Sequence, residues 1–505
     1  MTPRGVAVRL FLTLWTVYAV HFATDFGREH FLVVSMVDDG TFALDPYLGM
    51  HNDIFQLPDG RSYHGANPGV SMMAAVPYAA LKPVVDRVVN RELANRSGEV
   101  SAVYDDPRPA RQAFYRQARE NGWDIRFGFV SIITAVLFMA PLTAWSAAVL
   151  YRTLAAAGLP GSQALGGALV YGLGTPVFYR TAYLNQNLAV AVFALVAFCI
   201  LWDPGNRGAD RRRVRNLQAG LLGGLALLCD YSGAVALGLL GLYAVARRSD
   251  EVPLTTAIKD SLWFAAGAVG PILVLWYYQW AAFGNFIRPP QHHMPPVEWS
   301  DLGYQGITGP QAELFSLLLT DPRYGLFVAA PFLVLGLLAP WWTARRKTFI
   351  ATREVGFALL VALAYTVFFS AVQYTRLQYI HGIRYILPAV PFLFLATAVV
   401  LRRIPRVVTA IVVTGSVAFT WAQSMARIQE QETSLLAPVR RVVLEGLQLP
   451  ALETFERMAG QYAPSLQGSG VSAIPALLAT AVTIALIWLI RRPGRPLADV
   501  RVDPE

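Results

Sequence analysis

Charged residues are scarce in this sequence. Lys, Arg, Asp and Glu make up 15% of its 505 residues, whereas hydrophobic residues make up 55% and the mean hydropathy is +0.42. Soluble globular domains carry about 25% charged residues, and chains that remain disordered are poor in apolar residues. The composition therefore excludes a disordered protein and argues against an ordinary soluble enzyme.

Cysteine is scarcer still, since only Cys199 and Cys229 occur, both inside apolar segments. Two such thiols form neither a disulfide framework nor a recognised metal-binding pattern. Basic residues outnumber acidic ones by 42 to 33, which gives a net charge of +9. They stand in short clusters rather than in a stripe interleaved with aromatic residues, so we expect no nucleic-acid partner.

Long apolar runs, by contrast, recur from one end of the chain to the other. Runs near or above about 18 residues predict membrane-spanning helices. We expect an all-α polytopic membrane protein that forms one domain over residues 1–505, with about 11 to 13 transmembrane helices. The predicted spans are 6–24, 126–151, 162–180, 187–202, 217–246 (two short helices broken at 230–233), 261–283, 325–343, 355–373, 385–401, 407–423 and 472–490.

Arginine clusters set the expected orientation, because short loops rich in Lys and Arg stay in the cytoplasm. All of these clusters fall on one side if 68–85 is a helix lying on the membrane surface rather than a span. Both termini are then cytoplasmic. The expected outer segments are 25–125, which is large and contains the interfacial helix, 284–324 and 424–471, with shorter loops at 181–186 and 374–384.

Polar residues gather where the first span meets the outer face. Asp25 stands at this boundary, and Arg28 follows one turn later. A partly buried carboxylate near a cation can accept a proton from a hydroxyl group, so Asp25 is the candidate general base; the alternative is a pair that only caps the first helix. His51, Asp53 and His64 follow in a turn-rich loop, where a metal site is the alternative to a plain loop, although their spacing matches no recognised ligand pattern.

A second polar segment, 374–384, leads into a span at Arg384 and Tyr385. An arginine at the mouth of an apolar helix is costly unless it pairs with an anion, and guanidinium binds phosphate oxygens through two hydrogen bonds. Arg384 is therefore a candidate phosphate ligand, and Arg376 and His381 lie in the same segment. The alternative is that the Arg384 side chain reaches out to lipid headgroups.

The order of these motifs resembles a known family. After Asp25 and Arg28 the chain continues as DDGTFALDPY at 38–47 and YHGANPGVS at 63–71. The tripeptide Gly174-Thr175-Pro176 follows, and after it come GPQAELFSLLLTDPRYGLFVAAP at 309–331 and GIRYILP at 382–388. Together these resemble the bacterial polytopic glycosyltransferases of the GT-C superfamily, which are related to the protein O-mannosyltransferases and the lipid A aminoarabinose transferases.

The resemblance implies an enzyme of the bacterial cytoplasmic membrane with an extracytoplasmic active site. Such an enzyme transfers a sugar, with inversion, from a polyprenyl-phosphate donor to a hydroxyl group of a cell-envelope glycan or lipid. Asp25 matches the family's essential acid and Arg384 the arginine that holds the carrier phosphate. No cofactor is expected besides the lipid-linked donor, and the resemblance does not decide on a divalent metal. The substrate-binding set that we expect is Arg28, Asp53, His64, Arg376, His381, Arg384 and Tyr385.

The chain departs from the family at one position. Many relatives read Asp-Lys-Ala-Pro-Gly where this chain reads GANPG at 65–69, so the lysine that faces the phosphate is absent. Either His64, Arg28 or Arg376 supplies the missing charge, or the donor differs, or activity has been lost.

Two other functions stay open. A secondary transporter is favoured only by Asp230, which lies inside an apolar region; no inverted repeat is evident, and polar residues gather at the outer face rather than at the midplane. A non-catalytic protein that binds a polyprenyl lipid fits the absent lysine.

Overall fold

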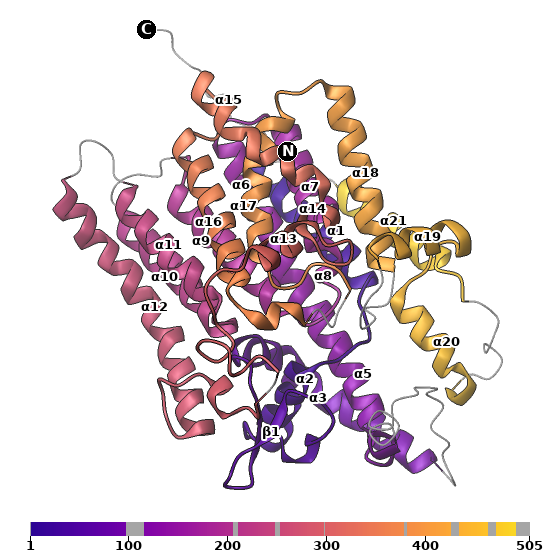
Figure 1. Ribbon diagram of the computed structural model, residues 1–505. Helices are drawn as coiled ribbons and strands as arrows, with labels where there is room; N and C mark the ends of the chain where they lie inside the picture. Colours follow the sequence, from indigo (N-terminus) through magenta and orange to yellow (C-terminus); the bar gives the residue numbers. More distant parts are fainter. Residues whose placement is uncertain are drawn as a thin grey trace.

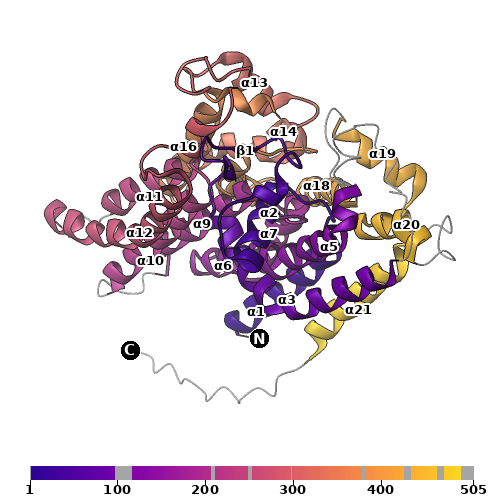
Figure 2. The same cartoon turned by 90° about the horizontal axis from the view of Figure 1, so that it is seen from below.

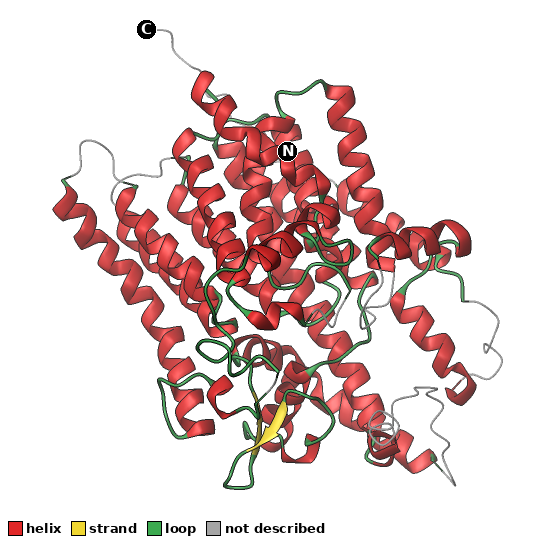
Figure 3. Ribbon diagram, viewed as in Figure 1, coloured by secondary structure: helices red, strands yellow, loops and turns green. Residues whose placement is uncertain are grey.

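The computed structural model of the protein describes residues 2–96, 116–205, 211–247, 253–296, 298–377, 381–425, 434–462 and 471–490. These residues form a bundle of helices with one small hairpin (Figures 1 and 3). The predicted class, an all-α polytopic membrane protein, is confirmed. The N-terminus lies at one end of the bundle, and the hairpin lies at the opposite end (Figure 1).

The principal helices are α1 (Pro3–Val20), α2 (Arg28–Val34), α3 (Gly69–Asn95), α5 (Trp123–Thr134), α6 (Ala140–Ala156), α7 (Gly161–Gly174), α8 (Val177–Arg180), α9 (Gln186–Trp202), α10 (Arg212–Cys229), α11 (Gly233–Ala246), α12 (Leu254–Phe283), α13 (Ala312–Thr320), α14 (Leu326–Ala329), α15 (Ala339–Arg345), α16 (Thr352–Ser370), α17 (Val390–Leu401), α18 (Arg406–Met425), α19 (Leu436–Glu445), α20 (Pro450–Tyr462) and α21 (Ile474–Leu489). The hairpin pairs β1 (Ile54–Gln56) with β2 (Ser62–His64), with Ile54 opposite His64.

Within the described ranges, four helices are long and apolar enough to cross a membrane. They are the continuous helix Trp123–Ala156, which runs from α5 through a π-helical turn to α6, and α12, α16 and α18. Shorter apolar helices of 10–17 residues lie at Gln186–Trp202, Gly233–Ala246, Leu387–Leu401 and Ile474–Leu489, within the predicted spans. Two predicted spans are wrong as single helices. The span 162–180 is divided at Thr175 and Pro176 into α7 and α8, and 325–343 forms α14, a 3-10 helix at Pro331–Leu338 and α15. Proline lacks a donor for helical hydrogen bonding, and Pro331 and Pro340 begin the last two of these pieces.

Small residues bring α10 and α12 close together. A Cβ atom on Gly220 would lie 1.9 Å from the Phe264 carbonyl oxygen, and one on Gly267 would lie 2.0 Å from the Leu217 carbonyl oxygen. Glycine at a crossing lets two backbones approach, which is the common way for helices to pack within a membrane. α9 lies at the centre of the bundle and is buried on nearly every side, as expected for a helix that is apolar all round.

The predicted helix break at 230–233 is confirmed, and it holds the outer segment in place. α10 ends at Cys229, Asp230 Oδ1 accepts the Ser232 N–H at 2.8 Å, and α11 begins at Gly233. Asn67 Nδ2 donates to the Leu227 carbonyl at 2.8 Å, and a Cβ on Gly69 would lie 2.6 Å from the Leu228 carbonyl. The start of α3 is therefore docked on the break in the α10–α11 pair.

α3 lies across the end of the bundle, seen lengthwise in Figure 2. Its first residues follow directly on the hairpin and the loop at 65–68, and it packs against α2 and α5. The outer segment between α1 and α3 is thereby folded back against the membrane helices, which brings its polar residues to the bundle.

Candidate functional site

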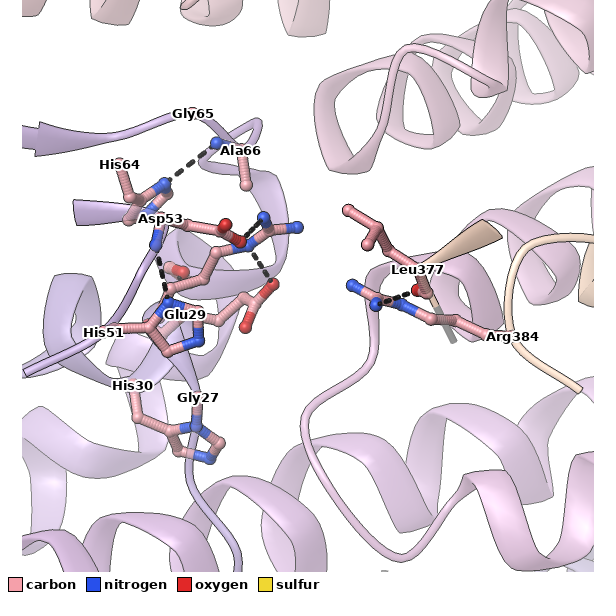
Figure 4. A network of polar contacts seen from close by, with 12 residues as sticks. Gly27, Glu29, His30, His51, Asp53, His64, Gly65, Ala66, Leu377 and Arg384 are labelled. Carbon is pink, nitrogen blue, oxygen red and sulfur yellow. Dashed lines mark hydrogen bonds and ion pairs between the residues drawn. The ribbon is translucent and has the colours of Figure 1, made fainter. Parts of the chain in front are cut away.

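An arginine and two carboxylates form the centre of the site, at the start of α2. Arg28 Nε donates to Glu29 Oε1 at 3.0 Å, and Arg28 Nη1 forms an ion pair with Asp53 Oδ2 from the loop before β1 (Figure 4). The side chains of Arg28 and Glu29 are 14% exposed and that of Asp53 is 28% exposed. The extended backbone at Gly27 begins α2, and a carboxylate in the first turn of a helix is favoured by the helix dipole.

Both carboxylates of this triad are ionised at neutral pH. Burial alone raises the pKa of Asp53, but the charges of Arg28, His51 and Arg384 outweigh it and lower that pKa to about 2. Burial likewise opposes ionisation of Glu29, but the charge of Arg28 outweighs it and lowers the pKa of Glu29. The Arg28 charge is therefore already balanced by two negative charges within the protein.

Three histidines of this region accept hydrogen bonds from backbone N–H groups. The Nδ1 atoms of His30, His51 and His64 accept the N–H groups of Gly27, Asp53 and Ala66, each at 3.0 Å. Burial lowers the pKa of His30 and of His64 to about 4. His64 is thus uncharged at pH 7 and does not replace the positive charge of the missing lysine. Across the described part of the chain, no three His, Cys, Asp or Glu side chains are grouped to hold a metal ion.

Arg384 faces the triad from the other side of the site (Figure 4). Its Nη1 donates to the Leu377 carbonyl at 3.2 Å, and its guanidinium carbon lies 4.8 Å from the centre of the Tyr385 ring. Its own carbonyl accepts Asn187 Nδ2 at 3.3 Å, which ties this segment to the start of α9. Among the described residues, no carboxylate forms an ion pair with Arg384. Its charge is therefore available to a ligand.

The Tyr385 ring lies under the Arg384 guanidinium, and the charges of Arg384, Arg28, Asp53 and Asp230 all act on its hydroxyl group. Five of the predicted site residues are thus brought together: Arg28, Asp53, His64, Arg384 and Tyr385.

Two predicted residues have other partners. Arg376 forms an ion pair with Glu313 of α13 at 3.1 Å and contacts Gln311 and Gln373. The His381 ring contacts Gln423 of α18 through Nε2.

Asp25 lies in the extended segment between α1 and α2 and is partly buried. The neighbouring Ala23 N–H donates to the Ala182 carbonyl at 2.7 Å, and Thr24 Oγ1 lies 2.5 Å from Thr454 Oγ1. The Asp25 segment therefore runs beside the 180–183 segment that links α8 to α9. Its role as general base stays a prediction.

Sequence reasoning missed Glu29 and the segment after α8. Glu29 follows Arg28 directly, and an Arg-Glu pair at the start of a helix is common on protein surfaces, so the sequence alone did not mark Glu29 as a site residue. The Tyr183 hydroxyl accepts Asn185 Nδ2 at 3.1 Å and is acted on by Arg180, Arg384 and Glu29. Arg180 had one usable signal: it is an arginine placed at the outer end of a predicted span, against the expected orientation rule.

An apolar cavity of about 370 Å³ lies between α1, α18, α19 and α21. Val17, Trp421, Ala422 and Met425 are among the residues that line it. Gln423 on the same turn of α18 contacts His381, whose carbonyl accepts Arg180 Nη1 at 3.2 Å. The cavity is thus connected through α18 to the segment that carries Arg384.

No known family model matches this chain, and none of the curated proteins matches its sequence. Among solved structures, ArnT from Cupriavidus metallidurans bound to undecaprenyl phosphate is similar, with 16% identity, a TM-score of 0.45 and coverage of 96% of this chain and 75% of ArnT. The apo state of that ArnT gives 14% identity, a TM-score of 0.47 and the same coverage. The Archaeoglobus fulgidus oligosaccharyltransferase in its apo form gives 12% identity and a TM-score of 0.43, over 85% of this chain and 57% of the other.

Proposed function

We propose that this protein is a membrane glycosyltransferase. It transfers a sugar from a polyprenyl-phosphate donor to a hydroxyl group of a cell-envelope glycan or lipid, with inversion and without a resident metal ion, at the outer face of a bacterial cytoplasmic membrane. The observation that carries the proposal is Arg384, a half-buried cation with no carboxylate at ion-pair distance among the described residues, facing a triad that contains two ionised carboxylates.

Arg384 provides the donor site in this proposal. A guanidinium group offers two parallel hydrogen bonds to phosphate oxygens, and a half-buried site strengthens that attraction relative to water. One N–H group of Arg384 is engaged by the Leu377 carbonyl, which fixes the direction of the side chain. The apolar cavity beside α18 offers a place for the first isoprenoid units, because ligand pockets of this kind have volumes of about 300–1,000 Å³.

Asp25 is the proposed general base. It would accept the proton of the acceptor hydroxyl as the hydroxyl oxygen attacks the anomeric carbon of the sugar. Glu29 is the rival carboxylate, but it already accepts a hydrogen bond from Arg28 Nε at 3.0 Å, and that contact lowers its pKa. A carboxylate with a depressed pKa is a weaker base, so Asp25 suits the step better than Glu29.

The first test is mass spectrometry of the lipids that co-purify with the detergent-extracted protein, with wild type and Arg384→Ala compared. We expect a polyprenyl phosphate, or its sugar conjugate, in the wild type and its loss in the variant. Bulk phospholipid alone in both samples would contradict the proposal and favour the transporter hypothesis, which ion-coupled uptake would then test.

The second test identifies the base. Vesicles that contain the donor found in the first test are assayed for transfer of labelled sugar by wild type, Asp25→Asn, Glu29→Gln and the exposed control Asp39→Asn. We expect Asp25→Asn to abolish transfer while donor binding and thermal stability remain. Full turnover by Asp25→Asn would refute its role, and selective loss in Glu29→Gln would move the role to Glu29.

A non-catalytic binder of polyprenyl lipids is the second candidate function. It is favoured by Ala66, which is 3% exposed and lies beside the triad (Figure 4) at the place where the resembling family carries lysine. The same vesicles separate the two functions, because a binder would retain the donor without transferring its sugar to any acceptor.

A further inference from the structure

Arg180 is a buried cation with hydrogen-bonding capacity that the protein does not use. It is the last residue of α8, and its side chain is 0% exposed. Nη1 donates to the His381 carbonyl at 3.2 Å, and the guanidinium carbon lies 5.2 Å from the centre of the Tyr183 ring. Nε and Nη2 are buried as well, and within the described ranges no atom accepts a hydrogen bond from either of them.

Such an arrangement is expensive for a purely structural residue. Arginine does not lose its proton in proteins, and a buried charge without a partner destabilises the folded state unless something compensates it. A single carbonyl would be satisfied by one neutral donor, so the contact with His381 does not require a charge. The two remaining donor atoms point to an anionic ligand.

Arg180 is held beside the segment that carries Arg384. Its hydrogen bond reaches His381, three residues before Arg384, while Asn187 donates to the carbonyl of Arg384. The 180–187 and 381–384 segments are therefore held side by side, and the charges of Arg180 and Arg384 repel each other. Neither arginine has an ion-pair partner among the described residues, whereas Arg28 has two. The site thus holds two positive charges, on Arg180 and Arg384, that form no ion pair with a described carboxylate.

We propose that Arg180 binds the second negative charge of a phosphate monoester, the group that leaves when the donor is cleaved. This inference rests on the proposed function. In that reaction the bond between the anomeric carbon and the phosphate oxygen breaks, its electron pair stays on that oxygen, and the acceptor oxygen forms the new bond to carbon while its proton passes to a carboxylate. The carrier changes from a phosphodiester with one negative charge to a monoester with two.

The two arginines have different roles, because the diester and the monoester differ by one negative charge. Arg384 alone matches the single charge of the diester, and Arg180 adds a donor for the charge that appears only as the bond breaks. An interaction that is stronger with the transition state than with the substrate raises the rate of the chemical step. Arg180 therefore determines the preference of the site for the dianionic form.

The experiment compares two probes that differ by one charge, a polyprenyl phosphate and its methyl diester, bound to the full-length protein in lipid nanodiscs at pH 8. At this pH the monoester is doubly charged, because its second pKa is about 6. We expect wild type to bind the monoester at least tenfold more tightly than the diester. In Arg180→Gln the preference falls to threefold or less while diester affinity stays within threefold, and the exposed control Arg61→Gln behaves as wild type.

A second variant and a stability measurement guard against misfolding. Arg180→Lys keeps the charge, so we expect it to retain most of the preference. Ligand-free Arg180→Gln should melt at or above the temperature of ligand-free wild type, since it removes an uncompensated buried charge. An Arg180→Gln protein that folds and keeps the full preference, or that loses affinity for both probes equally, overturns the proposal.

Arg384→Gln separates the failure of this proposal from failure of the proposed function. If Arg384→Gln weakens both probes at least tenfold while Arg180→Gln keeps the preference, only the role of Arg180 fails. If wild type binds neither probe, both proposals fail.

Discussion

Asp53→Asn should lower the stability of the protein and at the same time strengthen its binding of an anionic lipid. Asp53 is held in its ionised form mainly by Arg28, which lowers its pKa from 3.8 to about 2 against the opposing effect of burial. A difference of this size corresponds to about 2 kcal/mol, and partial exposure of the side chain reduces it to about 1–2 kcal/mol. We expect the free energy of unfolding to fall by that amount.

The pH dependence of this loss has a definite sign. A carboxyl group whose folded-state pKa is lowered contributes stability above its unfolded pKa, and that contribution is lost as the pH falls through the folded value of about 2. The difference between wild type and Asp53→Asn should therefore be constant from pH 5 to pH 8.

Binding should change in the opposite direction. Removal of one negative charge leaves Arg28 balanced by Glu29 alone and removes a repulsion on any anion held at Arg384. At an effective dielectric constant of about 20, two unit charges on the order of 10 Å apart repel each other by ~1–2 kcal/mol, so the repulsion removed is of the order of 1 kcal/mol. We expect a polyprenyl phosphate to bind about three- to tenfold more tightly.

Two assays on one preparation test the predicted fall in stability and the predicted rise in affinity. They are thermal unfolding followed by tryptophan fluorescence, and titration with polyprenyl phosphate in nanodiscs. Asp59→Asn is the matched control, because Asp59 lies in the same hairpin but is exposed, so the same change of charge should leave stability within about 0.5 kcal/mol. Weaker lipid binding by Asp53→Asn, or unchanged stability at pH 7, would refute the reasoning.

Three further perturbations follow from the structure. Burial lowers the pKa of His64 to about 4, so between pH 6.5 and pH 4 the side chain binds a proton in the unfolded state but not in the folded state, and stability falls as the pH falls. His64→Asn should therefore remove about 2 kcal/mol of the stability lost between pH 7 and pH 5. An unchanged slope of stability against pH in thermal melts would contradict this. Gly69→Ala places a methyl group 2.6 Å from the Leu228 carbonyl and should cost about 1–3 kcal/mol of stability, whereas Gly238→Ala, with nothing within 4 Å, should cost nothing in the same melts. Ala422→Trp fills the cavity between α1, α18 and α21 and should reduce the amount of co-purified polyprenyl lipid several-fold, as measured by mass spectrometry. The control Ile411→Trp, at an exposed position of α18, should not reduce it. Equal lipid content in the two variants would show that the cavity does not hold the lipid chain.

Much of the bundle follows from the sequence, because apolar length is a local property. The break at 230–233 is an example: Asp230 and Ser232 interrupt an apolar run with polar groups that bond to each other, and the two half-helices end and begin there. The segment 325–343 shows the limit. It is apolar enough to be predicted as a span, but Pro331 and Pro340 and its packing on α17 decide its backbone geometry, and hydropathy does not register either effect.

The candidate site was only partly predictable, because its residues meet through long-range contacts. Arg28 and Arg384 could be recognised singly, since each is a cation next to an apolar span. That Asp53 pairs with Arg28, that Glu29 joins them, and that the Arg376 charge is taken by Glu313 depend on how three outer segments fold together. The neutrality of His64 likewise depends on its burial, which residue spacing does not reveal.

The distribution of charge explains how the site can lack the lysine of the resembling family. Ala66 occupies that place, next to a triad whose net charge is negative. On the proposed function, the positive charge that a phosphate requires comes from the opposite side, where Arg384 and the buried Arg180 are held by the paired segments 180–187 and 381–384. In that proposal two cations match the two charges of a phosphate monoester. On the proposed function, Arg180 at the end of α8 supplies the second positive charge, so the carrier phosphate is bound by arginines alone and needs no cation at Ala66.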